Sequence, residues 1–411
     1  MRVVIIGNSA AGLAAAKTFR KYDQTSELVI VSKEKGLPYS RVLLPYVLRG
    51  KLDYKKIFIK GEGFYGENKI TYVEDTVTSI DTKEKILTLE ENNKLSYDKL
   101  LLATGAHAVA PPIEGIKQEG VYHMWTRADL DALGPLFDTK KSVVVLGSGF
   151  VALQAAWSAR YRGLDVKVIE IAKRVMPSVL DEAGGKLIAE KIADSGVELF
   201  TETVTQKIEK MDDGTFTIHL KDKEAIKTDF MIVGTGVRSN IQFLDDTGIE
   251  CERAILVDEY MQTNVEDVFS AGDVAAGPTT FGDKHLTHAL WPTAVEMGEV
   301  AGANLAGKKI AYRGSLNMNV TQMYDVTVAS MGLFNEEQID ESFVFDMDRY
   351  DGYMKVCYKD GLVVGACLVG DSEAVKLFGK LRTIIRKGIK AECVPEKLES
   401  FMDIKIFRDR A

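Results

Sequence analysis

Glycines and other small residues near the N-terminus have the spacing of a dinucleotide-binding turn. Residues 2–7 form an apolar run that predicts a strand, and an alanine-rich stretch begins at Ala10. Such a turn points the unpaired N–H groups of the next helix at one place, which attracts a pyrophosphate. Gly7 permits the tight turn, Ser9 stands where the backbone approaches the phosphates, and Gly12 allows close packing of helix and strand. Taken alone, the pattern also fits a buried strand–turn–helix without a ligand.

A second copy of this turn follows the apolar residues 142–146. Gly147 and Gly149 occupy the first two glycine places, and Ala152 takes the third, which is an accepted variant of the pattern. Each copy also has a later apolar strand that ends in small residues, at 103–105 in the first copy and at 234–236 in the second. This duplication is far more specific than one motif, and it predicts two dinucleotide sites.

Carboxylates stand where each site needs a partner for a ribose. Glu170 ends a predicted strand at 165–170, about 20 residues after the second turn. A carboxylate at this place favours the free 2′-hydroxyl of NAD and repels the 2′-phosphate of NADP, so NADH is predicted rather than NADPH. In the first copy, Lys33 and Glu34 stand at the corresponding place, and the sequence leaves open which of them faces the ribose.

Two further charged residues fit a site for a phosphorylated cofactor. Arg41 lies in an apolar, proline-rich segment, residues 36–46, which predicts a packed loop rather than a helix. Its guanidinium could pair with a phosphate, and the alternative is a surface arginine. Asp273 follows Gly272 at a predicted strand end, where it could reach a ribityl hydroxyl or the surroundings of the pyrophosphate; the alternative is a cap for the next turn.

The elements that position these residues follow from the hydrophobic periodicity. The stretch at 287–305 starts a helix with Pro292 in its first turn, and the N-terminus of that helix could stabilise negative charge on a reduced ring system. The other predicted helices cover residues 10–22, 151–161, 181–195 and 372–386. The predicted strands cover 27–31, 70–73, 77–81, 85–90, 100–102, 320–331 and 353–368, with a turn at Asp360-Gly361 in the last stretch and a meander at 197–230.

Composition limits the classes of function. The 411 residues suffice for two or three domains, and a net charge of −8 disfavours nucleic acid as a partner. No apolar run approaches the roughly 20 residues that span a bilayer. The four cysteines form no C-x-x-C pair, and His285 and His288 have no evident partner ligand, so no metal site is predicted. We expect reduced thiols and a cytoplasmic location.

Together these motifs resemble the two-dinucleotide-binding-domain flavoproteins, the FAD-dependent pyridine nucleotide–disulfide oxidoreductase superfamily. The resemblance implies an α/β fold with two Rossmann-like domains and a small α+β C-terminal domain. It assigns residues 1–111 and 244–311 to an FAD-binding domain, 112–243 to an NAD-binding domain, and 312–411 to a C-terminal interface domain. The implied FAD contacts are Gly7, Ser9, Ala10, Ala11, Gly12, Lys33, Glu34, Arg41, Val77, Ala103, Thr104, Gly105, Gly272, Asp273, Trp291 and Pro292; the implied NAD contacts are Gly147, Gly149, Phe150, Val151, Glu170, Gly234 and Gly236.

The branch within this superfamily depends on residues 37–46. Its disulfide reductases, coenzyme A disulfide reductases and NADH oxidases carry a redox cysteine beside the flavin. Val42 stands at that place here, and no cysteine precedes Cys251. The residues Pro38-Tyr39-Ser40-Arg41 instead resemble the corresponding loop of NADH:rubredoxin and NADH:ferredoxin reductases and of the flavin part of nitrite reductases. A lysine that is frequent in that subgroup is replaced by Tyr46.

This resemblance implies an FAD-dependent NADH oxidoreductase. Electrons would pass from NADH through the flavin to a small iron–sulfur carrier or partner subunit, or in reverse, with no side chain given a certain catalytic role. Two alternatives remain: a peroxide-forming NADH oxidase, and an electron-relay or NAD(H)-sensing subunit of a larger redox complex. Basic residues of the helix at 372–386 form either a solvated face or a docking patch for an acidic carrier, and the C-terminal domain could form a homodimer.

Overall fold

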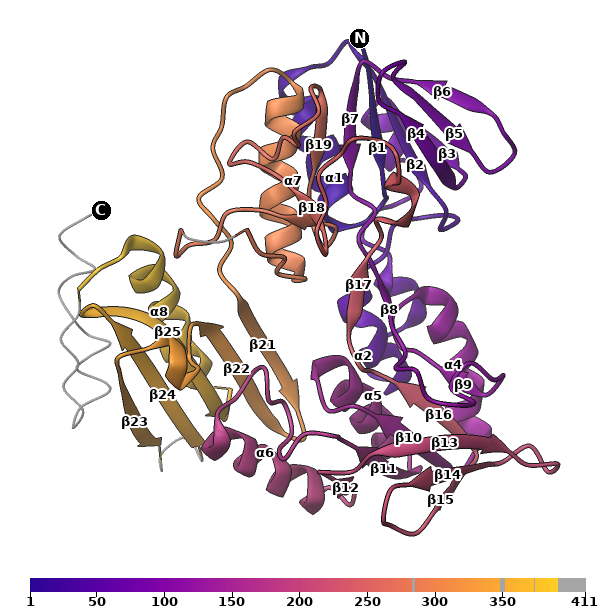
Figure 1. Cartoon of the computed structure of the whole chain (residues 1–411), viewed down its shortest axis with the longest axis vertical. Helices are drawn as coiled ribbons and strands as arrows, with labels where there is room; N and C mark the ends of the chain where they lie inside the picture. Colours follow the sequence, from indigo (N-terminus) through magenta and orange to yellow (C-terminus); the bar gives the residue numbers. More distant parts are fainter. Residues whose placement is uncertain (283–284, 348–351, 373, 391–411) are drawn as a thin grey trace. The chain divides into compact units, whose positions relative to one another are not determined.

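The computed structural model describes residues 1–282, 285–347, 352–372 and 374–390, and it divides into two compact units (Figure 1). The first unit consists of Met1–Val47, Leu52–Ala108 and Val237–Leu316. The second contains Leu48–Lys51, Val109–Gly236 and the chain from Asn317 onward. The division into three domains that the resemblance implies stays a prediction.

A parallel five-stranded sheet forms the centre of the first unit. The apolar residues of its first strand are buried, as expected for a parallel sheet that is covered on both faces. Ile6 pairs with Val31 on one side and with Leu102 on the other, so the loops that follow these strands meet at one edge. The strand order is β19 (Val268–Ser270), β7 (Lys99–Leu102), β1 (Arg2–Ile6), β2 (Glu27–Ser32) and β3 (Ile70–Glu74).

Two helices of the first unit, α1 (Ala10–Tyr22) and α7 (Trp291–Leu305), pack side by side (Figure 1). A Cβ on Gly298 would overlap the carbonyl of Ala11, and a Cβ on Gly302 would overlap the carbonyl of Ala15. The two glycines therefore let the helix backbones touch. The helix expected at 287–305 begins at Trp291 and has Pro292 in its first turn, where proline is tolerated.

The second unit repeats this plan. Its parallel sheet has the order β12 (Glu198–Phe200), β11 (Asp165–Ile169), β10 (Ser142–Leu146), β16 (Phe230–Val233) and β9 (Val121–Tyr122). In each unit an antiparallel three-stranded sheet comes between matching parallel strands: β4 (Val77–Asp81), β5 (Ile86–Leu89) and β6 (Lys94–Ser96) in the first, and β13 (Thr205–Lys210), β14 (Phe216–Leu220) and β15 (Ile226–Thr228) in the second. The predicted α/β fold with two related dinucleotide-binding folds is confirmed.

The C-terminal part of the second unit is an antiparallel sheet with a helix against it (Figure 1). The strand expected at 320–331 is in fact a hairpin, because Tyr324 and Asp325 both adopt positive φ, 49° and 62°, and form a tight turn. The sheet has the order β21 (Met318–Met323), β22 (Val326–Gly332), β25 (Leu362–Gly370), β24 (Gly352–Lys359) and β23 (Glu341–Met347), and the helix is α8 (Ala374–Lys387).

The segment at 36–46 differs from the expectation of a loop. It contains a 3₁₀ helix, η1 (Arg41–Leu43), followed by a short helix, α2 (Leu44–Leu48). Pro45 is the second residue of α2, where its missing N–H is not needed, so its presence does not prevent a helix.

The remaining elements are α3 (Phe64–Glu67), α4 (Arg127–Thr139), α5 (Phe150–Tyr161), α6 (Glu182–Asp194), β8 (Ala106–Ala108), β17 (Val237–Ser239), β18 (Ile255–Leu256), β20 (Ala275–Ala276), η2 (Tyr54–Ile57), η3 (Gln242–Leu244) and η4 (Glu336–Gln338).

Candidate dinucleotide sites

The first glycine turn is held by direct backbone contact. Gly7 has a φ of 121°, which L side chains rarely adopt, and a Cβ at this position would overlap the carbonyl oxygen of Ala103. A Cβ on Gly12 would overlap the carbonyl oxygen of Gly7. The backbone N–H of Ala103 donates to the carbonyl of Ile6 over 2.9 Å. The turn and the small-residue exit of β7 therefore lie together.

The second turn is built in the same way. Gly147 has a φ of 102°, and a Cβ on it would lie 2.6 Å from the carbonyl oxygen of Gly234. A Cβ on Gly234 would in turn lie 2.7 Å from the Cβ of Ala152. Ala152 is thus about as large as this place allows, which explains why it can replace the third glycine of the pattern. Here too the turn meets the exit of a neighbouring strand, β16.

Three helices that begin at predicted cofactor contacts have no side-chain caps. Ser9 before α1, Gly149 before α5 and Leu290 before α7 make no capping hydrogen bond, and none of the three helices has an acidic residue in its first turn. By contrast, α4 and α6 are capped by the side chains of Thr126 and Asp181, and each has an acidic residue in its first turn. Unpaired N–H groups at a helix N-terminus require an acceptor. The uncapped N-termini of α1 and α5, which follow the glycine turns, suit the phosphates of a dinucleotide.

Asp273 lies beside the first turn. The backbone N–H of Ala271 donates to the carbonyl of Leu102 over 3.1 Å, which puts the end of β19 next to the end of β7. Burial raises the pKa of the Asp273 carboxyl to about 6, while the charge of Arg41 acts in the opposite direction. Ser239 Oγ donates a hydrogen bond over 2.7 Å to the backbone carbonyl of Asp273 and not to its carboxylate. The carboxylate is therefore placed to accept a hydrogen bond from a ligand hydroxyl.

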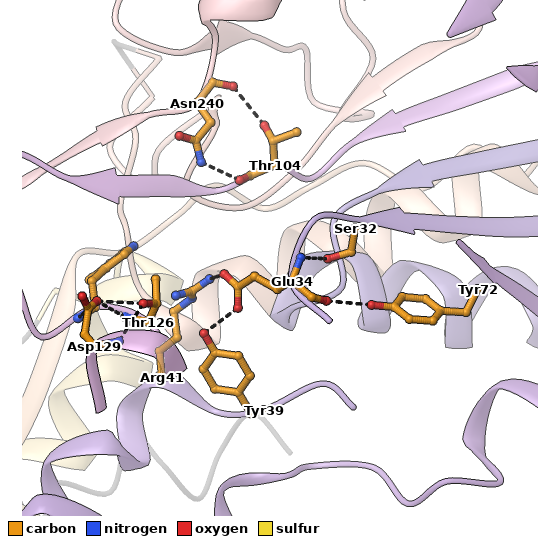
Figure 2. Close-up of polar contacts among 10 residues, drawn as sticks. Ser32, Glu34, Tyr39, Arg41, Tyr72, Thr104, Thr126, Asp129 and Asn240 are labelled. Carbon is orange, nitrogen blue, oxygen red and sulfur yellow. Dashed lines mark hydrogen bonds and ion pairs between the residues drawn. The ribbon is translucent and has the colours of Figure 1, made fainter. Parts of the chain in front are cut away.

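Glu34 is the centre of a polar cluster (Figure 2). One of its carboxylate oxygens accepts a hydrogen bond from Tyr39 Oη at 2.5 Å, and the other forms an ion pair with Arg41. The hydroxyl of Tyr72 donates to the carbonyl of Glu34 over 2.8 Å. Lys33 is exposed, whereas Glu34 is half-buried. The structure thus joins Glu34 and Arg41, and which residue contacts a ribose stays a prediction.

Asn240 holds the small-residue exit of β7, a role that the sequence analysis missed. Its Nδ2 donates to the carbonyl of Thr104 over 2.8 Å, and Thr104 Oγ1 donates to the carbonyl of Asn240 over 3.0 Å (Figure 2). The backbone N–H of Asn240 also donates to the carbonyl of Gly105, and its Oδ1 lies 2.7 Å from Nδ1 of His107. These partners are more than 130 residues apart in the chain, so no local pattern indicates them.

Glu170, the predicted ribose partner of the second site, is also held on both oxygens. Ser148 Oγ donates to Oε2 over 2.5 Å, and the backbone N–H of Ala172 donates to Oε1 over 2.8 Å. Glu170 is 8% exposed and Ser148 is 1% exposed. The sequence predicted Glu170 but not the contact with Ser148, for which a hydroxyl in the middle of the glycine turn was the only signal.

The other predicted contacts are distributed as follows. Gly272 has a φ of 82°, and its Cβ position lies 3.0 Å from the Cβ of Ala11, at the start of α1. Trp291 and Pro292 begin α7. Val77 is buried in β4, where its backbone pairs with Leu89. Their contacts with a cofactor stay predictions, as do those of Ala10, Phe150, Val151 and Gly236.

The cysteines of the described residues are unsuited to thiol chemistry. Cys357 and Cys367 are buried, and Cys251 is half-buried. Burial raises the pKa of all three thiols, that of Cys357 to about 12, so almost no reactive thiolate forms at neutral pH. Cys393 lies outside the described residues. Within the described part of the chain, no group of three His, Cys, Asp or Glu residues could hold a metal ion, and no helix is long and apolar enough to cross a membrane.

Comparisons with known proteins agree with this architecture. The NADH oxidase of Methanocaldococcus jannaschii is 31% identical and covers 95% of this chain and 92% of its own. The NADH-rubredoxin oxidoreductase of Clostridium acetobutylicum is 26% identical and covers 93% of this chain and 94% of its own. The nitrite reductase of Bacillus subtilis is 29% identical over 93% of this chain, but the chain spans only 47% of that protein's length.

A solved structure and two family models extend these similarities. The NAD-dependent persulfide reductase from A. fulgidus has a TM-score of 0.89 and 26% sequence identity, and the match covers 99% of this chain and 83% of that one. Residues 318–389 match the rubredoxin NAD⁺ reductase C-terminal domain. Residues 1–298 match the pyridine nucleotide–disulphide oxidoreductase family. Because this match covers well over half of the chain, the protein belongs to the pyridine nucleotide–disulphide oxidoreductases and is an oxidoreductase that uses FAD and NAD(H).

Proposed function

We propose that this protein oxidises NADH through bound FAD and passes the electrons to a small iron–sulfur carrier of the rubredoxin or ferredoxin type, or to an iron–sulfur partner subunit. The observation that carries the proposal is the absence of a cysteine before Cys251 in a chain with two uncapped dinucleotide turns. When bound, FAD takes a hydride equivalent from NADH and can release electrons one at a time.

The first unit would hold FAD. Gly7 and Gly12 would let the backbone approach the pyrophosphate, and the uncapped N-terminus of α1 would donate its N–H groups to that anion. Asp273 would accept a hydrogen bond from a ribityl hydroxyl. The uncapped N-terminus of α7, which begins at Trp291, would stabilise negative charge on the ring system.

The second unit would hold NADH in the same manner. Gly147 and Gly149 form the phosphate turn, and the uncapped N-terminus of α5 provides N–H donors. Glu170 would accept hydrogen bonds from the hydroxyls of the adenosine ribose. No side chain acts as a general acid or base in this scheme, since the protein contributes binding, orientation and charge stabilisation.

The chemistry of the cysteines supports an external electron acceptor. Val42 stands in η1 where a redox thiol would be needed, and it is 56% exposed. The described cysteines are buried or half-buried and have raised pKa values. Among the described residues, no cysteine is therefore suited to a thiol–disulfide relay. Similarity to the NADH-rubredoxin oxidoreductase and to the rubredoxin reductase C-terminal domain supports a carrier of the iron–sulfur type.

A comparison of acceptors tests the proposal. The FAD-loaded protein is mixed with NADH under anaerobic conditions, and reduction of rubredoxin, ferredoxin and a disulfide is followed by absorbance. We expect at least one iron–sulfur carrier to be reduced much faster than the disulfide. Faster reduction of the disulfide would refute the proposal.

The similarity to an NADH oxidase favours a second candidate, in which oxygen is the acceptor. Without a redox cysteine at residue 42, this reaction would release hydrogen peroxide. Peroxide formation in air at a rate above the rate of reduction of any carrier would support this candidate.

Slow turnover that becomes fast only with a co-purified partner would instead indicate a subunit of a larger redox complex. A homodimer through the C-terminal domain and a cytoplasmic location remain parts of the proposal. Gel filtration tests the first, and cell fractionation tests the second.

A further inference from the structure

We propose that Ser148 is a positioning residue that locks Glu170 in place and thereby sets the preference for a nucleotide with a free 2′-hydroxyl. This inference rests on the proposed binding of NADH at the second glycine turn. Ser148 is the middle residue of that turn, between Gly147 and Gly149, and Glu170 follows β11. The two residues are 22 positions apart in the chain and meet through a hydrogen bond of 2.5 Å.

The Ser148 hydroxyl has two partners, which fix its direction. It donates its proton to Oε2 of Glu170, and it accepts the backbone N–H of Met176 at 3.2 Å. Because that N–H occupies an acceptor position on the oxygen, the proton is directed at Glu170. With 1% exposure, Ser148 is shielded from water, so no solvent molecule competes for this contact.

Glu170 is held on the other side by the backbone. The N–H of Ala172 donates to Oε1 over 2.8 Å, and the backbone of Glu170 itself is tied to β12, where its N–H donates to the carbonyl of Phe200 over 2.8 Å. Each carboxylate oxygen thus has one fixed donor and keeps further acceptor capacity, because an ionised carboxylate offers about four lone-pair positions. The remaining positions suit the two hydroxyls of a ribose.

This rigidity is what makes the carboxylate selective. A carboxylate that could rotate away would relieve the repulsion from a 2′-phosphate and admit NADPH. Here both oxygens are tied, so a 2′-phosphate would meet a fixed negative charge at a site that is only 8% exposed. Removing the Ser148 hydroxyl frees one oxygen and allows the side chain to turn. Discrimination should therefore fall even though Glu170 itself is still present.

Two variants and one matched control test this role. Ser148→Ala removes the hydroxyl, and Ser148→Thr keeps a hydroxyl at the same place. Ser142→Ala is the control, since Ser142 Oγ also donates to a carboxylate, Asp229 Oδ2 at 3.0 Å, but at the opposite end of the same strand, β10. Binding of ADP-ribose and of 2′-phospho-ADP-ribose to the FAD-loaded proteins is measured by calorimetry, with circular dichroism to confirm folding. These ligands carry no nicotinamide, so the readout does not depend on turnover.

For Ser148→Ala we expect the ratio of the two dissociation constants to move about tenfold toward the 2′-phosphorylated ligand, the effect of losing one charge-assisted hydrogen bond. KM for NADH should rise by a similar factor with kcat within about twofold. Ser148→Thr should recover most of the discrimination, and Ser142→Ala should leave the ratio unchanged. An unchanged ratio in a folded Ser148→Ala protein overturns the inference and leaves the proposed function intact. A wild-type protein that prefers the 2′-phosphorylated ligand would instead overturn the assignment of NADH itself.

Discussion

Replacing Asp273 by asparagine should have opposite effects on the cofactor-free and the FAD-loaded protein. In the cofactor-free protein, the carboxylate is a charge held in a mostly buried place, and burial raises its pKa from 3.8 to about 6 against the influence of Arg41. An acid whose pKa is higher in the folded than in the unfolded state makes folding less favourable once it is ionised. Asparagine has nearly the same shape and carries no charge.

The magnitude follows from the difference between the two pKa values. A rise from 3.8 to about 6 corresponds to at most about 3 kcal/mol at 1.36 kcal/mol per pKa unit, and partial contact with water reduces this to about 1–3 kcal/mol. The folded state binds more protons than the unfolded state between these values, so the stability of the wild type falls as pH rises from about 4 to 6. Asp273→Asn should therefore stabilise the cofactor-free protein by about 1–3 kcal/mol at pH 8 and by little at pH 4.5.

Urea denaturation of the cofactor-free protein between pH 4.5 and 8.5 measures this difference. Asp229→Asn is the control: burial alone would raise the pKa of Asp229, but hydrogen bonds from Lys141 and Ser142 lower it, so the control should be destabilised throughout this range. In the FAD-loaded protein, Asp273→Asn should weaken FAD binding about tenfold or more, because a charged acceptor is lost. A destabilised cofactor-free variant at pH 8, or an effect that does not change with pH, would refute the reasoning.

Two other predictions concern packing and thiols. Gly302→Ala places a Cβ against the Ala15 carbonyl and should lower the free energy of unfolding by about 3 kcal/mol. Gly379→Ala, at an exposed position of α8 with open space around it, should raise the free energy of unfolding by about 0.5–1 kcal/mol. Thermal denaturation of both variants measures this difference, and equal effects would contradict the close packing of α1 and α7. Cys357 and Cys367 should resist a thiol reagent at pH 8 until the protein unfolds, because burial raises the pKa of both thiols. Mass spectrometry of labelled peptides identifies which cysteines react. Rapid labelling of Cys357 in the folded protein would show the interpretation to be wrong.

The sequence predicted most of the fold because the motifs of this fold are local. A strand, a glycine turn and a helix follow each other within about 30 residues, so residues 2–22 and 142–161 could be interpreted without knowledge of their neighbours. The duplication indicated two dinucleotide units, each with a later strand that ends in small residues. The structure adds that the strands ending at Leu102 and Val233 pair with the strands that precede the two turns.

The errors have specific physical causes. The hairpin at Tyr324 and Asp325 was predicted as a continuous strand, because neither residue is the glycine or asparagine that usually indicates a tight turn. The helix at Leu44–Leu48 differs from the expected loop because Pro45 lies in its first turn, where proline is tolerated. The hydrogen bonds between Thr104 and Asn240 join residues 136 positions apart and depend on the tertiary structure alone.

The distribution of helix caps links stability to the proposed function. Thr126 and Asp181 satisfy the N–H groups of helices that begin away from the glycine turns, and a cap of this kind contributes about 1 kcal/mol. The helices that begin at the candidate sites lack this contribution, and Asp273 adds a further unfavourable charge in the first unit. Under the proposed function, bound cofactors would offset these deficits by supplying acceptors to the helix N-termini and a hydroxyl donor to Asp273. A ligand that binds only the folded state stabilises it in proportion to the logarithm of its concentration over its dissociation constant. FAD should therefore stabilise the first unit strongly, and a Gly7→Ala protein that cannot bring its turn against Ala103 should lose both the cofactor and this stabilisation.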